Sequence, residues 1–277
     1  MSLKKQVYVV FLYGIALALC AFALFPVAWD LSTSLKPDSL IFHQPPQWIP
    51  GQITLGHYGE VLRNADMARY FINTFITAIL STVAALAIGV LGAYGFSRHK
   101  FPGNKTLMMS IMLTRLLPRV ALIVPFLATL RNIGLYNTRP GLILVFMVVT
   151  MPLSLWMLKG FFDSIPYEIE EAAVVDGCSP LGILFRVDLP IIMPAVASVG
   201  MYIFITAWNE FLLALTMTQG KALRTISVGL AFYIDELGVR WGSLMAASIL
   251  MSIPAMLVFS MFSKFLIRGL SEGAVKG

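Results

Sequence analysis

Residues 168–190 read EIEEAAVVDGCSPLGILFRVDLP, a polar segment between two long apolar runs of the chain. Ser164 is the expected N-cap of a first short helix, and Pro166 is compatible with its first turn. The glutamates that follow place negative charge near the positive end of the helix dipole, where it is stabilising. Gly177 can adopt the left-handed backbone conformation that commonly ends a helix.

A second short helix is expected directly after this turn. Ser179 and Pro180 are residue types typical of an N-cap and of the first helical position. The pair Leu189-Pro190 is expected to end this helix before the next apolar run. The segment is therefore predicted to form a rigid helix-turn-helix outside the bilayer. Such order favours a docking surface for a partner protein over a plain solvated connector.

The composition indicates a membrane protein independently of this segment. Hydrophobic residues make up 58% of the 277-residue chain, charged residues make up 12%, and the mean hydropathy is +0.82. A soluble domain would carry about 25% charged residues. Apolar runs of about 20 residues, the length of one helical crossing, recur along the chain. We expect one all-α polytopic membrane domain over residues 1–277. Its six expected spans are residues 7–29, 71–96, 107–130, 140–158, 191–215 and 244–267.

The first apolar run also has features of a cleaved signal peptide. Lys4 and Lys5 precede it, and Ala21-Phe22-Ala23 offers a small-residue cleavage site. The run continues past that site to Trp29, which is too long for the apolar region of a signal peptide. It is therefore interpreted as the first membrane span.

Positively charged residues set the expected orientation, because Lys and Arg are enriched in short cytoplasmic loops. Arg98, Lys100 and Lys105 lie together in the short loop after the second span. Placing this loop in the cytoplasm puts both termini inside and puts the loop 159–190 on the side of the membrane where ATP is found. The net charge of +6 is then explained by anchors beside anionic lipid headgroups.

Several function classes lack their sequence features. The nearest approach to a phosphate-binding loop, GNKT at 103–106, lacks the Gly-Lys pair. No nucleophile, base and orienting residue form a catalytic pattern, and no Cys/His cluster has metal-ligand spacing. Cys20 falls in a span and Cys178 in a loop, which argues against a disulfide. A basic patch interleaved with aromatic residues, as nucleic-acid binding would need, is also missing.

The polar segment resembles the signature loop of ABC-importer permeases. Glu171-Ala172-Ala173, three further residues, Gly177, and nine residues later V-x-L-P match that loop, except for Val187 where the family more often has Ile. Shorter matches resemble the carbohydrate importers of the maltose type, nearest to the second of their two permease subunits. These matches are SLKP at 34–37, GLYNT at 134–138, WNE at 208–210 and the ending RGLSEGAVKG at 268–277.

The resemblance implies a type I ABC-importer permease fold in a bacterial inner membrane. It implies that the coupling loop 159–190 docks on a cytoplasmic ATPase through Glu171, Ala172, Ala173 and Gly177. It further implies three kinds of partner: a second homologous permease subunit, two copies of the ATPase, and an extracytoplasmic solute-binding protein. ATP and Mg²⁺ would be bound by the ATPase subunits, so no cofactor is expected in this chain.

Polar residues inside the expected spans are candidates for the substrate pathway, because burying them in lipid is costly. Trp208, Asn209 and Glu210 lie in the fifth span. An aromatic ring, an amide and a carboxylate are suited to stack on a sugar and to bind its hydroxyl groups. Alternatively, Asn209 and Glu210 cap or bridge neighbouring helices and never meet the substrate.

Arg115 and Arg119 are less expected, because a helical spacing of four places both on one face of the third span. At a rise of 1.5 Å per residue they would lie about 12 and about 18 Å from its cytoplasmic start. Three interpretations remain open: an internal ion pair with Glu210, a cationic site for an anionic sugar derivative, or a span that begins later than expected.

The sequence therefore predicts a non-catalytic permease subunit that imports a sugar or sugar derivative, driven by ATP hydrolysis on its partners. The alternative within the same class is an importer of an anionic sugar, such as a phosphorylated, sulfonated or acidic one, that uses Arg115 and Arg119. A secondary transporter driven by an ion gradient is a less favoured alternative, because Glu210 is the single carboxylate well inside a span that could serve a proton relay.

Overall fold

The computed structural model describes residues 3–235 and 238–274, so the last three residues of the ending at 268–277 lie outside the described residues. The chain forms two compact units. Unit 1 comprises Met1–Ala68 and Gly229–Ile253, and unit 2 comprises Arg69–Val228 and Pro254–Gly277. The helices α4 (Ala65–Arg98) and α14 (Trp241–Ala274) each pass from one unit into the other.

Unit 1 is built around the first helix and the start of the last. Its remaining elements are short and lie between 35 and 64 and between 229 and 240. The two strands pair antiparallel, with Ile234 opposite Val239. In chain order the elements are α1 (Leu3–Ser34), α2 (Asp38–Ile41), α3 (Gly56–Arg63), the 3-10 helix η3 (Ala231–Tyr233), β1 (Ile234–Asp235) and β2 (Gly238–Val239).

A buried histidine joins the short elements of unit 1 to the start of α14. His57 Nε2 donates to the Lys36 carbonyl oxygen at 2.9 Å, and Nδ1 lies 3.4 Å from Ser243 Oγ. A Cβ atom on Gly242 would lie 2.2 Å from the His57 ring, so only glycine permits this approach. The neighbouring Glu60 accepts from Ser243 at 2.5 Å and pairs with Arg240 at 3.0 Å.

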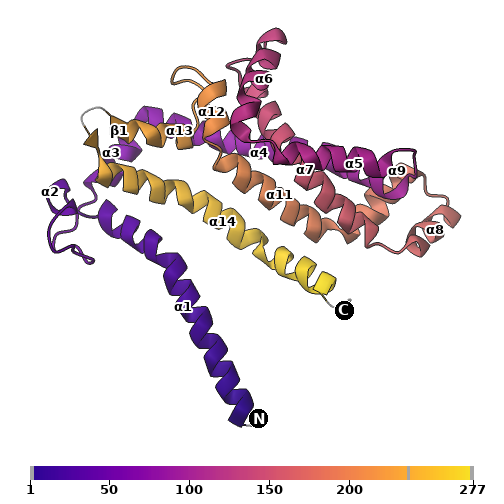
Figure 1. Cartoon of the computed structure of the whole chain (residues 1–277), viewed down its shortest axis with the longest axis horizontal. Helices are drawn as coiled ribbons and strands as arrows, with labels where there is room; N and C mark the ends of the chain where they lie inside the picture. Colours follow the sequence, from indigo (N-terminus) through magenta and orange to yellow (C-terminus); the bar gives the residue numbers. More distant parts are fainter. Residues whose placement is uncertain (1–2, 236–237, 275–277) are drawn as a thin grey trace. The chain divides into compact units, whose positions relative to one another are not determined.

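Unit 2 contains the helices that carry the candidate sites. Figure 1 shows α5, α7 and α11 side by side, and α7 contacts both of the others. The elements are α5 (Asn104–Leu113), the 3-10 helix η1 (Thr114–Leu116), α6 (Arg119–Asn132), α7 (Arg139–Asp163), α8 (Tyr167–Val175), α9 (Pro180–Ile183), the π-helix η2 (Leu184–Asp188), α10 (Leu189–Ile191), α11 (Met193–Trp208), α12 (Leu212–Met217) and α13 (Ile226–Leu230), whose end passes into unit 1.

Small residues let the helices of unit 2 approach closely. A Cβ atom on Gly92 of α4 would lie 3.0 Å from Leu155 of α7, and one on Gly200 of α11 would lie 3.0 Å from Leu86 of α4. Such contacts are typical of helices in a membrane, where packing and not water exclusion drives helix association. The core they build includes Leu158, which is fully buried.

The third expected span is not one straight helix. The two parts Asn104–Leu116 and Arg119–Asn132 meet at an angle of 105°. Leu117 has extended backbone angles of −67° and 130°, because a residue before proline is biased away from the helical region, and Pro118 follows it. The expectation that Arg115 and Arg119 share one helix face is therefore wrong.

The fifth expected span is interrupted twice. Pro180–Ile191 meets Met193–Trp208 at an angle of 80°, and α11 ends at Trp208 before α12 begins at Leu212. In the part of the chain that the structure describes, four helices are long and apolar enough to cross a membrane. That number rises to six if each bent pair counts as one span. The long helices overlap the expected first, second, fourth and sixth runs, and α7 extends to Asp163.

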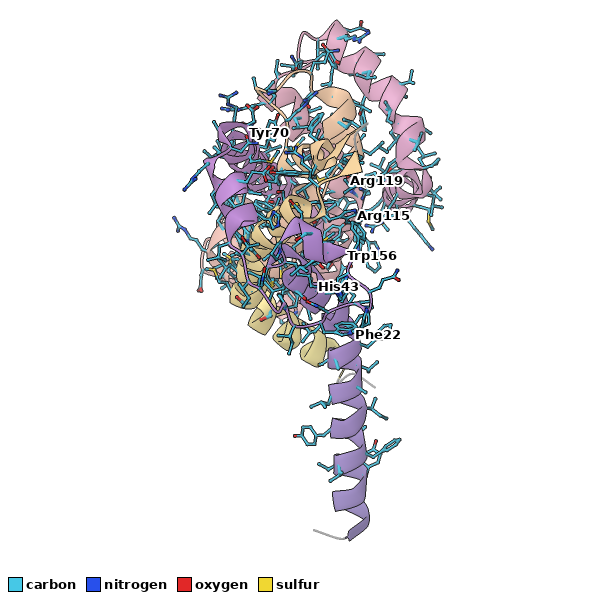
Figure 2. The ribbon with its side chains drawn as sticks, turned by 90° about the vertical axis from the view of Figure 1, so that its left-hand side faces the viewer. Phe22, His43, Tyr70, Arg115, Arg119 and Trp156 are labelled. Atoms are coloured by element: carbon cyan, nitrogen blue, oxygen red, sulfur yellow. The ribbon has the colours of Figure 1, made fainter. Side chains whose placement is uncertain are left out.

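The first helix differs from the others in its surroundings. None of the residues in its most apolar window is buried, and Phe22 is 81% exposed. Figure 2 shows the side chains of α1 projecting outward around Phe22. An apolar helix of this kind needs lipid or another membrane helix around it.

Candidate functional site

The polar loop folds as two short helices around a tight turn. Gly177 has φ +82°, in the left-handed region, and ends α8 as expected. Ser179 caps α9, its Oγ accepting from the Gly182 amide at 3.2 Å. Ser164 does not cap α8, contrary to expectation. It ends α7, with Oγ donating to the Phe161 carbonyl at 2.7 Å, and Pro166 stands at the N-cap position of α8.

The second helix does not end at Leu189-Pro190, again contrary to expectation. A π-helical turn at Leu184–Asp188 continues α9 into α10, which begins with Leu189 and Pro190. Proline is tolerated in the first turn of a helix because its missing amide hydrogen would have no partner there. The chain turns only after Ile191, into α11.

The outer face of α8 carries part of the expected coupling set. Glu171 and Ala172 are exposed, together with Val174 at 59% and Val175 at 85%. Ala173 is only 8% exposed and faces the body of unit 2. The docking role of Glu171, Ala172, Ala173 and Gly177 stays a prediction, and Val174 and Val175 are exposed beside Glu171 and Ala172.

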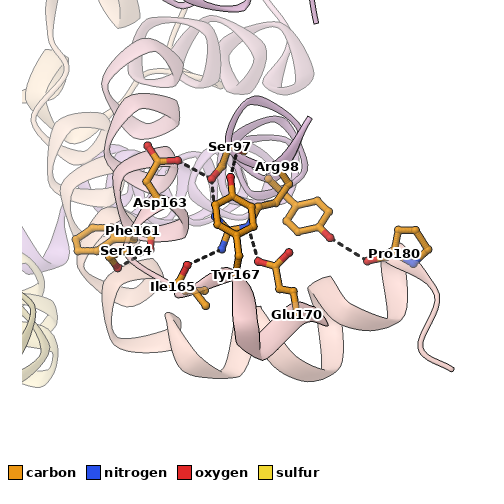
Figure 3. A network of polar contacts seen from close by, with 10 residues as sticks. Ser97, Arg98, Phe161, Asp163, Ser164, Ile165, Tyr167, Glu170 and Pro180 are labelled. Atoms are coloured by element: carbon orange, nitrogen blue, oxygen red, sulfur yellow. Dashed lines mark hydrogen bonds and ion pairs between the residues drawn. The ribbon is translucent and has the colours of Figure 1, made fainter. Parts of the chain in front are cut away.

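The inner face of α8 is held by Arg98, the last residue of α4. Its guanidinium forms an ion pair with Glu170, and the exposed fractions of the two side chains are 4% and 12%. It also donates to the Ile165 carbonyl at 3.2 Å and lies 4.8 Å from the centre of the Tyr167 ring. Figure 3 shows these contacts converging on Arg98.

Neighbouring residues tie the same end of α4 to α7 and α9. Ser97 Oγ donates to Asp163 Oδ1 at 2.6 Å and accepts from Arg98 at 3.1 Å. Tyr94 donates to the Pro180 carbonyl at 3.3 Å (Figure 3). The end of α4 thus contacts both short helices of the polar loop, α8 and α9, and also α7, which precedes the loop.

A second carboxyl group, Asp188, is buried beside this ion pair. It is fully buried, and as a carboxylate it finds no hydrogen-bond donor among the described residues. Burial, followed by the charge of Glu170, raises the pKa of Asp188 to about 6, although Arg98 acts in the opposite direction. The charged form of Asp188 is therefore disfavoured by its surroundings.

At the far end of α11, Glu210 bridges three segments. It forms an ion pair with Arg119 at the start of α6. Its other carboxylate oxygen accepts from the Leu213 amide at 3.1 Å at the start of α12, and its carbonyl accepts from Ser227 at 2.8 Å. These contacts match the expected alternative in which Glu210 bridges helices, and they pair it with one of the two arginines.

Arg115 has a different environment from Arg119. It is exposed and donates to the Tyr202 hydroxyl of α11 at 3.1 Å, with its guanidinium 5.8 Å from the ring centre. No carboxylate among the described residues lies within ion-pair distance of it. Arg115 and Arg119, both labelled in Figure 2, stand on either side of the break in the third run.

The other two expected pathway residues separate. Trp208 is fully buried, stacked on Phe204 and edge-on to Phe71 and Phe75, and its place on the pathway stays a prediction. Asn209 is exposed, and its side-chain amide donates to the Ile205 carbonyl at 2.9 Å. Of the WNE motif, only Asn209 presents an accessible polar side chain.

The two candidate regions are separate in unit 2. The polar loop joins the start of α11, and Glu210 follows its end, so the 16 residues of α11 lie between them. At the helical rise of 1.5 Å per residue this is about 24 Å. Sequence reasoning missed Arg98 and Asp188 as parts of the loop site. Arg98 was interpreted only as an orientation signal, and nothing in the local pattern paired it with a glutamate 72 residues away.

The chain is similar to known transport proteins along most of its length. The family described as "Binding-protein-dependent transport system inner membrane component" matches residues 85–272. A sulfoquinovosyl glycerol transport permease, SmoH of Agrobacterium fabrum, is 35% identical over 254 residues, covering 92% of this chain and 89% of that protein. The trehalose permease SugB of Mycobacterium tuberculosis is 34% identical, covering 92% of this chain and 93% of SugB. The trehalose/maltose permease MalG of Thermococcus litoralis is 32% identical, with 95% of each covered.

A solved structure has the same fold. A chain of a bacterial ABC transporter involved in import of the acidic polysaccharide alginate superposes with a TM-score of 0.81 at 24% identity, covering 95% of this chain and 98% of that one. The likeness confirms the expected all-helical fold of an ABC-importer permease.

Proposed function

Because the chain belongs to the inner-membrane components of binding-protein-dependent transport systems, and within them to the carbohydrate ABC-importer permeases, we propose that it imports a sugar or sugar derivative as one half of a heteromeric pore. Members of this family are non-catalytic permease subunits of the inner membrane. The proposed partners are a second homologous permease, two cytoplasmic ATPases that bind ATP and Mg²⁺, and an extracytoplasmic solute-binding protein.

The observation that carries the proposal is the two-sided environment of α8. Glu171, Ala172, Val174 and Val175 are exposed on its outer face, while its inner face is held to α4. An exposed, rigid and partly apolar helix face is suited to fit a groove on another protein. In the proposed mechanism, closure of the ATPases on ATP moves α8, which opens the pore outward, and hydrolysis returns it to the inward-facing state.

The proposal places both termini and α8 in the cytoplasm. The supporting feature is the charge of the loop that joins α4 to α5, where Lys100 and Lys105 are joined by Arg98 at the helix end. Glu210 would then lie toward the extracytoplasmic side, about 24 Å along α11 from the cytoplasmic loop.

Reconstitution in proteoliposomes tests this function. The chain would be purified with its second permease and ATPase, and the solute-binding protein would be added on the outside with radiolabelled sugars. ATP-dependent uptake that requires both the binding protein and the ATPase supports the proposal. Uptake driven by an ion gradient without ATP would contradict it and favour a secondary transporter.

Arg115 favours a second candidate, the import of an anionic sugar. It is an exposed cation with an adjacent tyrosine ring, and no described carboxylate neutralises it. A guanidinium binds a sulfonate, phosphate or carboxylate, and the ring can stack on a sugar face. The relative SmoH is named as a permease for sulfoquinovosyl glycerol, which is consistent with this candidate.

The two candidates differ in their dependence on Arg115. If the sugar is anionic, Arg115→Gln should abolish uptake of the anionic sugar and leave uptake of a neutral analogue unchanged. If the transported sugar is neutral, the same variant should have little effect on the uptake of either compound. Arg131→Gln is a suitable control, because Arg131 also lies over a tyrosine ring, that of Tyr136 at 4.9 Å, but at the opposite end of α6 from the break.

A further inference from the structure

We propose that Arg98 is the residue that transmits movement of α8 to the membrane-spanning helix α4. The inference rests on the proposed function, since it assigns the residues through which movement of the ATPase would be transmitted to the pore. Arg98 is a positioning residue in this scheme, because it acts through α8 and does not contact ATP or solute.

The length of α8 is the first argument. A helix of 9 residues is marginal on its own, because helices shorter than about 12 residues are unstable in water. It can act as a rigid lever only if something holds its inner face. In the structure that face carries Glu170, paired with Arg98, and the buried Ala173. The Arg98–Glu170 ion pair thus connects the inner face of α8 to the end of α4.

The second argument is the convergence of contacts on one side chain. Arg98 contacts Glu170 and the Tyr167 ring on α8, and the Ile165 carbonyl in the link between α7 and α8. A planar guanidinium can hold several partners at fixed angles, which a lysine could not do. Movement of α8 is therefore expected to displace Arg98, and with it the end of the 34-residue helix α4.

The third argument is the balance of charge. Buried ion pairs are costly to break, because the remaining partner stays unpaired. The Arg98–Glu170 pair is of this kind, because the two side chains are only 4% and 12% exposed. Moving α8 away from α4 would leave both charges buried and unpaired, so the two helices are expected to move together.

Removing Glu170 tests this connection directly. Glu170→Ala should leave assembly with the ATPase intact, since alanine favours a helix and the exposed face of α8 is unchanged. ATP hydrolysis should continue, while solute moved per ATP hydrolysed should fall about tenfold, within the usual range of coupling between sites. Glu168→Ala is the matched control, because Glu168 lies on the same helix, is exposed, and has no partner among the described residues.

A charge exchange separates transmission from a merely structural role. Arg98→Glu alone should uncouple the complex, and Arg98→Glu combined with Glu170→Arg should recover part of the solute moved per ATP. A wild-type ratio in Glu170→Ala would overturn the inference, as would equal loss in the Glu168→Ala control or no recovery in the exchange variant. If the wild-type complex shows no ATP-dependent uptake at all, the proposed function itself fails, and that outcome is distinguishable from these.

Discussion

Arg119 and Glu210 form an ion pair across 91 residues of sequence, at a point where both of their helices are interrupted. Arg119 opens α6 after the break at Pro118, and Glu210 follows the end of α11. Helix ends leave backbone amides and carbonyls without partners, and Glu210 satisfies one such amide at Leu213. The pair therefore joins two broken helices where regular backbone bonding fails.

Breaking this pair should destabilise the complex. Glu210 is 4% exposed and Arg119 is 50% exposed, so Arg119→Gln strands the more deeply buried partner. We expect a loss of about 2 kcal/mol, the order of cost for a buried polar group left unsatisfied. Thermal unfolding of the detergent-solubilised complex measures this loss. Adding Glu210→Gln to Arg119→Gln should restore part of it, and strictly additive losses would argue against an interaction.

The outer face of α8 should be required for coupling to the ATPase. Glu171→Lys reverses a charge on that face, and Gly177→Val places a β-branched residue at φ +82°, a conformation that only glycine adopts without strain. Both variants should insert in the membrane but lose the ATPase on co-purification or lose ATP-dependent uptake. Full uptake by both would remove the basis for assigning this face to the ATPase.

The orientation of the chain can be read by cysteine labelling. Ser39 and Ser179 are both exposed, in loops expected on opposite sides of the membrane. In a background without Cys20 and Cys178, an impermeant thiol reagent added to intact cells with a permeabilised outer membrane should label Ser39→Cys and leave Ser179→Cys unlabelled. The opposite pattern would reverse the orientation and exclude contact between α8 and a cytoplasmic ATPase.

Asp188 should make the stability of the complex depend on pH. Its pKa is raised from 3.8 to about 6 in the folded chain, so the folded state favours the protonated form. The contribution of Asp188 to the free energy of unfolding is therefore fully present below about pH 4 and is lost as the pH rises through about 6. The loss is at most about 3 kcal/mol for a pKa shift of about two units.

The variant Asp188→Asn tests that dependence, because asparagine resembles the protonated acid and cannot ionise. It should raise the unfolding temperature at about pH 8 and have almost no such effect at about pH 2.5, where Asp188 is protonated in both states. Asp163→Asn serves as a control, because Asp163 is a carboxylate of the same loop region that is bound by Lys159 and Ser97. A pH-independent difference for Asp188→Asn would contradict a raised pKa of Asp188 in the folded chain.

Local patterns were sufficient for the turn between the two short helices of the coupling loop, although not for the outer ends of those helices. The turn at Gly177 and the cap at Ser179 depend on neighbours within three residues, so their residue types alone specified them. The apolar runs likewise specified the long helices, because lipid leaves the backbone no alternative to internal hydrogen bonding. Pro118 was a local signal for the break in the third run that the hydropathy of the run concealed.

Tertiary structure alone decided which of the polar residues meet. Arg98 and Glu170 are 72 residues apart, and Arg119 and Glu210 are 91 apart, and no local rule selects these partners. Tertiary packing also turned Trp208 into the core and Ala173 inward, although both stand in motifs that suggested exposed roles. Spacing along a chain determines which side chains share a helix face, whereas the choice of which face is buried depends on helices that arrive from elsewhere in the sequence.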